Sequence, residues 1–318
     1  MNRNSKILFI DGTSVFIRNW IQNPSMNDNG EPIGGVMGFI NTLYEMIEMF
    51  QPTRIIIAFD GKSPLDWRRG INTEYKNTRF SELKFNRIYN ILTNDDELKW
   101  LKNQFTMLYQ LLQKLPTKIV SIERYESFDT ISHLIKNNVT QNSLSIIISS
   151  NIDFIQFVNT KTIVYSPYKK IKYDTTITDD ISTNMLFLYN VIHGNKRYGI
   201  PGVKNIGIKK FKKWFETNSC NTTLDDIINI SKNNIDNSVI YRNIVAEEKL
   251  IRTNKLLMSP NIEIPPDNII EINDIYNSPD TKFNKLKFLD KLNDFKMLHN
   301  IRNFNFMLDY TFSKIILQ

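Results

Sequence analysis

The chain has 318 residues, of which 41% are hydrophobic and 23% are charged, so it can bury one large core or two intimate ones. Its single cysteine, Cys220, excludes an intramolecular disulfide, and three histidines far apart in sequence exclude a Cys/His metal site. The net charge of +7 favours a polyanionic partner, and no apolar run approaches the roughly 20 residues that span a bilayer.

Short apolar runs alternate with helical patterns over the first half of the chain. In chain order, strands are predicted at 6–10, 54–59, 118–121, 145–149 and 162–165, and helices at 35–50, 82–115 and 127–136. The helix at 82–115 is expected in two pieces, broken near 93–95. Continuous apolar strands separated by helices are typical of an α/β fold with a mainly parallel central sheet flanked by helices.

From about residue 180 the pattern is mostly helical. Prolines at 260, 265 and 266 mark a loop, and a last helix is predicted from about 282 to 298. We therefore expect an α/β part over 1–180 and a helical part over 181–318, packed as one unit. The late aromatics Phe304, Phe306, Tyr310 and Phe312 are interpreted as core, with docking of a partner protein as the alternative.

Acidic residues follow three of the predicted strands. Asp11 and Asp60 end the first two, and Asp153 lies just beyond the strand at 145–149. The carboxyl ends of parallel strands share one rim of the sheet, where ligands bind. Carboxylates gathered there could hold two divalent ions about 4 Å apart, which clamp the attacking water and the leaving oxygen of a phosphodiester. A single strand-end aspartate can equally be a turn former or a helix N-cap.

The run GNKRYGIPGVKNIG at 194–207 carries a specific resemblance. It matches without a gap the Gly-Asp-x-x-Asp-Asn-Ile-Pro-Gly-Val-x-Gly-Ile-Gly pattern of the flap endonuclease and 5′–3′ exonuclease superfamily. Four upstream motifs resemble the family's in the same order: IDGT at 10–13, AFDGK at 58–62 with WRR and YKNTR after it, YESFD at 125–129 and ISSNID at 148–153. The resemblance covers roughly 5–265 and is closest to the phage ribonuclease H and 5′-exonuclease branch. It implies a PIN-like nuclease core with a helical arch at about 63–101 and a helix–hairpin–helix element at about 200–215.

The resemblance also implies a set of metal-binding positions, which this chain fills only in part. The retained acids are Asp11, Asp60, Glu126, Asp129 and Asp153, and the degenerate positions hold Phe128, Asn151, Asn195 and Tyr198. One implied metal keeps most of its ligands, whereas the other keeps only Asp153. Asparagine cannot supply charge to hold Mg²⁺, and the two aromatic side chains add bulk. We therefore expect Mg²⁺ at one weakened site, or no metal.

Two basic clusters are predicted to contact nucleic acid. In the hairpin, glycines allow close backbone approach and lysines neutralise phosphates without reading sequence. At the base of the arch, the resemblance implies that Lys76 and Arg79 contact the scissile phosphate if the chain is active, and Tyr75 could stack a base. Asn205 stands where the family has glycine, and asparagine tolerates a left-handed conformation. The predicted contacts are Arg68, Arg69, Tyr75, Lys76, Arg79, Gly202, Lys204, Gly207, Lys209, Lys210, Lys212 and Lys213.

These features favour a catalytically impaired or inactive 5′-nuclease homologue that binds flap, branched or junction DNA in replication or repair. One alternative is an active metal-dependent 5′–3′ exonuclease, flap endonuclease or ribonuclease H with an altered metal site. Another is a scaffold subunit of a larger protein assembly, whose partners would be replication or other assembly proteins. The expected partner is DNA at a flap, junction or single-strand/double-strand boundary, or an RNA–DNA hybrid, and no membrane. The polar N-terminus is unlike a signal peptide, which predicts a cytoplasmic location, in a bacterial host if the chain is phage-encoded.

Overall fold

A computed structural model describes residues 5–77, 85, 93–138, 143–175, 183–218, 223–260, 263–279, 282–300 and 311–312. Of the predicted arch, 78–84 and 86–92 lie outside the described residues, as does Cys220. Among the residues described, no helix is long and apolar enough to cross a membrane.

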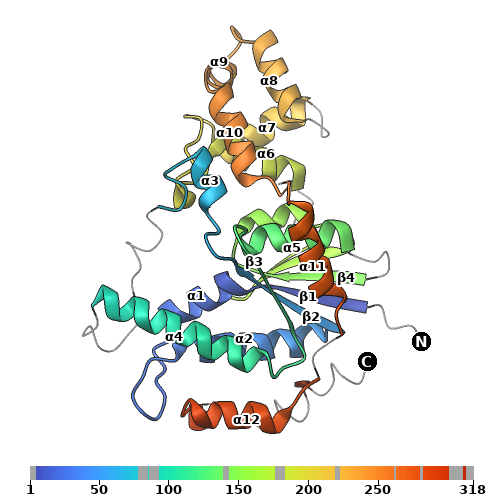
Figure 1. Cartoon of the computed structure of the whole chain (residues 1–318). Coiled ribbons are helices and arrows are strands. Elements are labelled where there is room, and N and C mark those ends of the chain that lie inside the picture. The colour runs from blue at the N-terminus through green and yellow to red at the C-terminus, as the bar shows by residue number, and fades with distance from the viewer. Residues whose placement is uncertain are drawn as a thin grey trace.

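A six-stranded sheet lies at the centre of the molecule, in the order β3-β2-β1-β4-β5-β6 (Figure 1). The strands are β1 (Ser5–Asp11), β2 (Arg54–Asp60), β3 (Lys118–Ile122), β4 (Ser143–Ile148), β5 (Thr162–Ser166) and β6 (Ile171–Tyr173). The first five pair in parallel, as the continuous apolar runs predict, and β6 is antiparallel to β5. Sequence reasoning missed β6 because its three residues are largely exposed and form no apolar run.

Helices cover both faces of the sheet (Figure 1). On one face lie α1 (Gly12–Gln22), α2 (Gly34–Phe50) and α4 (Asn94–Leu112), which share a core with Leu8 and Ile10. On the other lie α5 (Ser127–Asn138) and α11 (Pro266–Asn277), which share a core with Ile7 and Phe9. Successive residues of β1 therefore enter opposite cores, which requires the uninterrupted apolar strand seen in the sequence.

Local signals fix where several helices begin. Thr93 and Asp96 form a reciprocal capping box at the start of α4, which is the break predicted near 93–95. Pro266 occupies the first turn of α11, where its missing N–H costs no hydrogen bond. Asn284 caps α12 (Lys285–Asp294), which packs against the α1, α2 and α4 side of the sheet together with Phe312.

The remaining helices build a third core above the carboxyl end of the sheet (Figure 1). They are α6 (Thr183–His193), α7 (Ile208–Asn218), α8 (Leu224–Asn233), α9 (Val239–Ala246) and α10 (Glu248–Met258). The short α3 (Asp66–Ile71) lies against α10, and Tyr75 belongs to this third core. The division by sequence is therefore not the division in space, since the predicted base of the arch joins the helical part, and α11 and α12 return to the sheet.

Candidate metal and nucleic-acid site

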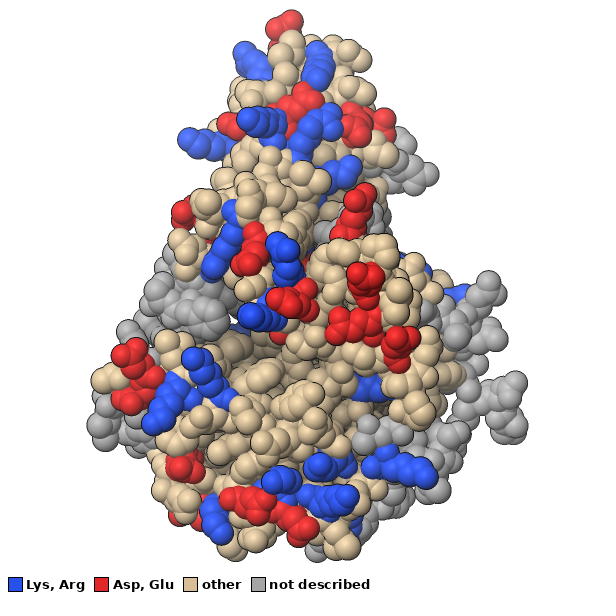
Figure 2. Space-filling model, viewed as in Figure 1, with Lys and Arg blue, Asp and Glu red and all other residues tan. Residues whose placement is uncertain are grey.

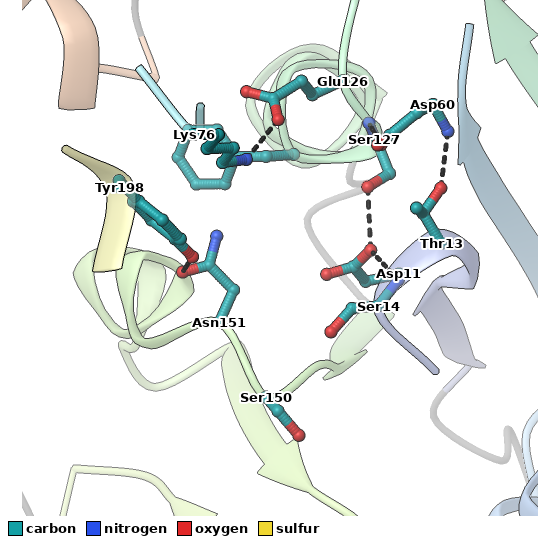
Figure 3. Close-up of a pocket in the computed structure, with 11 residues that line it drawn as sticks. Asp11, Thr13, Ser14, Asp60, Lys76, Glu126, Ser127, Ser150, Asn151 and Tyr198 are labelled. Atoms are coloured by element: carbon teal, nitrogen blue, oxygen red, sulfur yellow. Dashed lines mark hydrogen bonds and ion pairs between the residues drawn. The ribbon is translucent and has the colours of Figure 1, made fainter. Parts of the chain in front are cut away.

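The carboxyl ends of β1, β2 and β4 meet at one rim of the sheet. The strand order reverses between β1 and β4, because β2 and β3 lie on one side of β1, and β4 and β5 lie on the other. Asp11 ends β1, Asp60 ends β2, and Asn151 follows β4 as the N-cap of the short 3₁₀ helix η1 (Ile152–Phe157). These three side chains open into a small cleft of about 30 Å³ (Figure 3). The cleft is lined by Asp11, Thr13, Ser14, Asp60, Lys76, Glu126, Ser127, Phe128, Ser150, Asn151 and Tyr198.

Both carboxylate oxygens of Asp11 accept protein hydrogens. The Ser127 hydroxyl donates to Oδ1 at 2.8 Å and the Ser149 hydroxyl donates to Oδ2 at 2.6 Å. The backbone N–H of Ser14 also donates to Oδ1 at 3.2 Å, so Asp11 caps α1. Sequence reasoning did not select these serines, although Ser127 and Ser149 lie inside the quoted motifs next to positions that it did select.

Asp60 accepts the backbone N–H of Ser127 at 2.8 Å through Oδ1. Burial and the neighbouring Glu126 carboxylate raise the pKa of Asp60 above its ordinary value. The Ser127 hydrogen bond and the nearby Lys76 ammonium offset this rise only in part, so the Asp60 carboxylate remains costly to ionise.

The third acidic segment is already paired with a cation of the protein itself. The Arg68 guanidinium donates to both oxygens of Asp129, at 2.6 and 2.8 Å, and to Glu126 Oε2 at 2.7 Å. All three side chains are buried. This is a bidentate fork on one carboxylate with a further bond to a second, the geometry in which charge-assisted hydrogen bonds are strong.

Lys76 holds the other oxygen of Glu126. Its ammonium forms an ion pair with Glu126 Oε1 (Figure 3). The Tyr75 hydroxyl donates to Glu126 Oε2 at 3.1 Å. Burial alone raises the pKa of Glu126, but Lys76 and Arg68 outweigh it and hold that pKa below its ordinary value. Glu126 is therefore an ionised carboxylate whose acceptors are engaged.

Two of the degenerate positions bond to each other. The Tyr198 hydroxyl donates to Asn151 Oδ1 at 3.0 Å, and the same oxygen accepts the backbone N–H of Asp153 at 3.0 Å. The Tyr198 ring also lies 4.7 Å from the Lys76 ammonium, in cation–π contact. The half-buried Asp153 has a pKa raised to about 6, chiefly by burial, which Lys76 and Arg68 oppose.

The other two degenerate positions serve the fold. Phe128 packs edge-on against Phe154 at 5.0 Å and near Phe157 at 6.3 Å. Asn195 exchanges backbone hydrogen bonds with Ile200, at 2.8 and 3.0 Å, which closes the turn before the hairpin. Phe128 also lines the cleft, so its ring closes this part of the rim with apolar surface.

These contacts test whether the side chains fit the two divalent ions that the resemblance implies. Across the described part of the chain, no group of three or more His, Cys, Asp or Glu side chains is arranged to hold a metal ion. Glu126 and Asp129 are committed to Arg68 and Lys76, and a neutral Tyr–Asn pair fills the second side of the cleft. The residues present therefore do not fit a two-metal centre.

The structure corrects part of the predicted nucleic-acid contact at the base of the arch. Arg68 is 1% exposed and Tyr75 is 4% exposed, so neither reaches a phosphate or a base from this position. Basic side chains were read as surface groups, but the buried carboxylates draw Arg68 inward. Lys76 is also buried, Arg69 is exposed, and Arg79 lies outside the described residues.

The hairpin segment presents its predicted groups to solvent more openly. Asn205 adopts the left-handed conformation, with φ of 66°, that its glycine-like position requires. Gly202 lies so close to His193 that an added Cβ would stand 1.7 Å from the carbonyl oxygen, whereas one at Gly207 would meet nothing within 4 Å. Four lysines of this segment are exposed and Lys212 is half-buried; the exposed ones are Lys204, Lys209, Lys210 and Lys213.

Comparison with known proteins agrees with the motifs. Residues 6–184 match the sequence model of the family described as 5′-3′ exonuclease, N-terminal resolvase-like domain. The 5′-3′ exonuclease of Bacillus subtilis is 26% identical over 221 residues, which are 65% of this chain and 68% of that protein. DNA polymerase I of Caldicellulosiruptor bescii is 25% identical over 66% of this chain and 24% of its own length. The chain thus spans about a quarter of the polymerases that it matches.

Solved structures share the fold at low sequence identity. The phage T5 5′-exonuclease with bound zinc ions has a TM-score of 0.63 at 17% identity, over 91% of this chain and 98% of that one. The catalytic core of Rad2 in complex with a DNA substrate has a TM-score of 0.52 at 16% identity, over 98% of this chain and 93% of that one. These similarities confirm the predicted α/β architecture flanked by helices.

Proposed function

This chain belongs to the 5′-3′ exonuclease family defined by the N-terminal resolvase-like domain, and we propose that within this family it is a DNA-binding protein without two-metal hydrolysis. Its substrate class is flap, branched or junction DNA, encountered during replication or repair. The fold supplies the scaffold, the hairpin supplies the backbone contacts, and the cleft at the sheet rim is closed by the protein's own side chains.

The hydrogen bond from Tyr198 to Asn151 carries the proposal. Both residues stand where the family pattern has acids, and together they form a neutral pair that excludes an ion from this side of the cleft. A two-metal mechanism requires the second ion to stabilise one of the two oxygens of the displacement, and it requires charged oxygen ligands to hold that ion. Asp153 is the one remaining acid of this set, and burial raises its pKa to about 6, so the cleft disfavours its charged form relative to water.

DNA binding rests on the exposed lysines of the hairpin. Lys204 precedes the left-handed turn, and Lys209 and Lys210 lie in the first turn of α7. On the face shown in Figure 2, acidic and basic side chains alternate over the upper helices, so no broad patch of one sign attracts DNA there. Affinity should therefore depend on a few local contacts between lysines and phosphates. Each contact releases counterions from the DNA, which makes binding salt-dependent.

Branched DNA is proposed as the ligand because proteins with a similar fold have been solved with DNA bound. Rad2 is seen with a DNA substrate, and human GEN1, with a TM-score of 0.51 at 12% identity, is seen with Holliday junction DNA. The contacts available here are to backbone rather than to base edges, which suits recognition of shape over sequence.

A second candidate is an active nuclease that uses one metal. Asp11, Asp60 and Glu126 line the same cleft, and relatives of this chain are named 5′-3′ exonucleases. Such an enzyme would need Glu126 to leave Lys76 before it could bind an ion. The two candidates differ in one measurable outcome, which is cleavage.

The test pairs binding with cleavage on the same DNA. The purified chain is titrated with labelled 5′-flap, three-way junction, nicked and blunt duplexes in EDTA, and then incubated with each in Mg²⁺ or Mn²⁺. We expect preferential binding to the flap and junction in EDTA and no metal-dependent cleavage. Sustained cleavage at the 5′ end would establish the second candidate instead, and equal affinity for blunt duplex would remove the preference for branched DNA.

A matched pair of variants locates the DNA-binding surface. Neutralising Lys204, Lys209 and Lys210 to glutamine should weaken binding and lower the slope of log Kd against log salt by roughly 3. The control neutralises three exposed lysines near α12, on the far side of the sheet: Lys282, Lys287 and Lys296. Equal loss in both variants would show that net charge, rather than the hairpin, determines binding.

A further inference from the structure

The turn between β5 and β6, residues 167–170, carries cations that the hairpin contact does not use. It follows the carboxyl end of β5 and therefore lies at the same rim of the sheet as the cleft. Tyr168 is 51% exposed, and Lys169 and Lys170 are exposed beside it. Asp174, farther along the same strand pair, is bonded to Lys172 at 2.8 Å. Within the described part of the chain, no acid pairs with Lys169 or Lys170.

Two elements connect this turn to the cleft. Ser14 lines the cleft, and Arg18 lies four residues farther along α1, on the same side of the helix. The Arg18 guanidinium stacks on the Tyr168 ring, 3.6 Å from its centre. Ser150 also lines the cleft, and its hydroxyl lies 3.3 Å from the hydroxyl of Ser166, where β5 ends. A basic surface therefore adjoins the cleft on the sheet side, and its members are Arg18, Tyr168, Lys169 and Lys170.

The backbone of the turn is costly for the residue that it carries. Lys170 adopts the left-handed conformation, with φ of 54°. Glycine or asparagine is favoured there, because a longer side chain crowds the following carbonyl oxygen. Lysine at this point lowers stability and presents a cation to solvent, and backbone costs of this kind concentrate at functional sites.

The chemistry of the basic surface fits the backbone of nucleic acid. Ammonium and guanidinium groups neutralise phosphates without reading the bases. Stacking on Tyr168 fixes the plane of the Arg18 guanidinium, so less freedom is lost when it contacts a phosphate. The hairpin lies on the helical part and the basic surface lies on the sheet, and the two parts meet at the cleft. The arms of a branched DNA leave the branch point in different directions, so two such surfaces can hold two arms at once.

We propose that the basic surface binds the sugar–phosphate backbone of a second duplex arm while the hairpin binds the first. The proposal rests on the proposed function and deepens it, because it names the feature that makes branched DNA bind more tightly than blunt duplex. A blunt duplex has a single axis and engages the hairpin alone.

The first test removes two charges from the turn. In Lys169→Gln/Lys170→Asn, asparagine suits the left-handed conformation, so the variant should melt no lower than the parent. In EDTA, its Kd for a 5′-flap with two duplex arms should rise on the order of tenfold at about 0.1 M salt, and the slope of log Kd against log salt should fall by roughly 2. Its Kd for blunt duplex should change by less than about twofold, because the hairpin is intact.

The control removes two exposed lysines away from the rim. Lys161 directly precedes the amino end of β5, and Lys287 lies in α12. Lys161→Gln/Lys287→Gln should leave the Kd for the flap within a factor of about two of the parent's, because neither lysine adjoins the cleft. An unchanged flap Kd in the turn variant would overturn the proposal. So would an equal rise for flap and blunt duplex, or an equal rise in the control.

A crosslinking experiment identifies the arm directly and does not depend on the charge variants. A photoreactive benzoylphenylalanine replaces Tyr168 in one protein and Lys209 in another, and the two duplex arms of the flap carry different labels. We expect crosslinks from position 168 to one arm and from position 209 to the other. Crosslinks from both positions to the same arm, or from position 168 to the unpaired strand alone, would overturn the proposal. Cleavage by the parent in Mg²⁺ would refute the loss of two-metal hydrolysis but leave these EDTA measurements decisive, so the two can fail separately.

Discussion

The Tyr198–Asn151 pair gives the sharpest test of the closed cleft. Tyr198→Phe removes one hydroxyl and keeps the ring, which remains in contact with the Lys76 ammonium at 4.7 Å. Asn151 Oδ1 still accepts the N–H of Asp153, so no buried acceptor is left without a partner. The loss is then one neutral hydrogen bond, about 0.5–1.5 kcal/mol of the free energy of unfolding.

Tyr198→Asp removes the ring as well. The side chain is 7% exposed and belongs to the third core, beside Tyr75 at 6.2 Å. Truncating a buried aromatic residue costs about 3–5 kcal/mol, and a new ion pair with Lys76 offsets part of it. We therefore expect a loss of roughly 2–4 kcal/mol, clearly larger than that of the phenylalanine variant.

The assay is urea unfolding followed by circular dichroism, with Tyr109→Phe as the control, since Tyr109 is 41% exposed on α4. A Tyr198→Phe variant as stable as the Tyr109→Phe control would show that the hydroxyl bond contributes nothing. A phenylalanine variant as unstable as Tyr198→Asp would contradict the division between ring and hydroxyl on which the reasoning rests.

The other predictions address charge and packing in the same cleft. The pKa of Asp153, about 6 in the folded chain against about 3.9 in the unfolded chain, means that ionisation destabilises the fold as pH rises from 4 to 6, by up to about 3 kcal/mol and by less at this half-buried position. Asp153→Asn should therefore gain stability relative to the parent over that range, and parallel pH–stability curves would refute the shift. Phe128→Asp should lose at least 3–5 kcal/mol, about the cost of truncating a buried aromatic, because the carboxylate enters the cluster with Phe154, whereas Phe128→Leu should lose much less; equal losses in urea unfolding would refute this. Asn151→Asp should keep both hydrogen bonds, leave stability nearly unchanged and weaken DNA binding in EDTA, and unchanged or tighter binding would show that DNA does not approach the cleft.

The sheet could be predicted from the sequence because its strands are buried on both faces. Such strands are continuous apolar runs, and β1 and β2 begin and end within a residue or two of the predicted bounds. The strand-end position of Asp11 and Asp60 follows from the same runs. The break predicted near 93–95 coincides with the start of α4, where the capping box at Thr93 involves residues only three apart.

The contacts of the cleft could not be predicted, because their partners are remote in sequence. Arg68 bonds to residues 58 and 61 positions away, and Tyr198 bonds to a residue 47 positions away. A basic residue in a short polar segment is interpreted as a surface group until a buried carboxylate is known to face it. Periodicity and composition contain no information about that pairing.

The changes in the cleft therefore act as a connected set rather than as independent losses. Tyr198 bonds to Asn151 and lies against Lys76, Lys76 pairs with Glu126, and Glu126 shares Arg68 with Asp129. Returning an acid to position 151 alone would add charge beside Asp153 but would leave Glu126 and Asp129 bound to their cations. Recovery of metal binding should consequently require acids at several of these positions together, and an acid at position 151 alone should restore little.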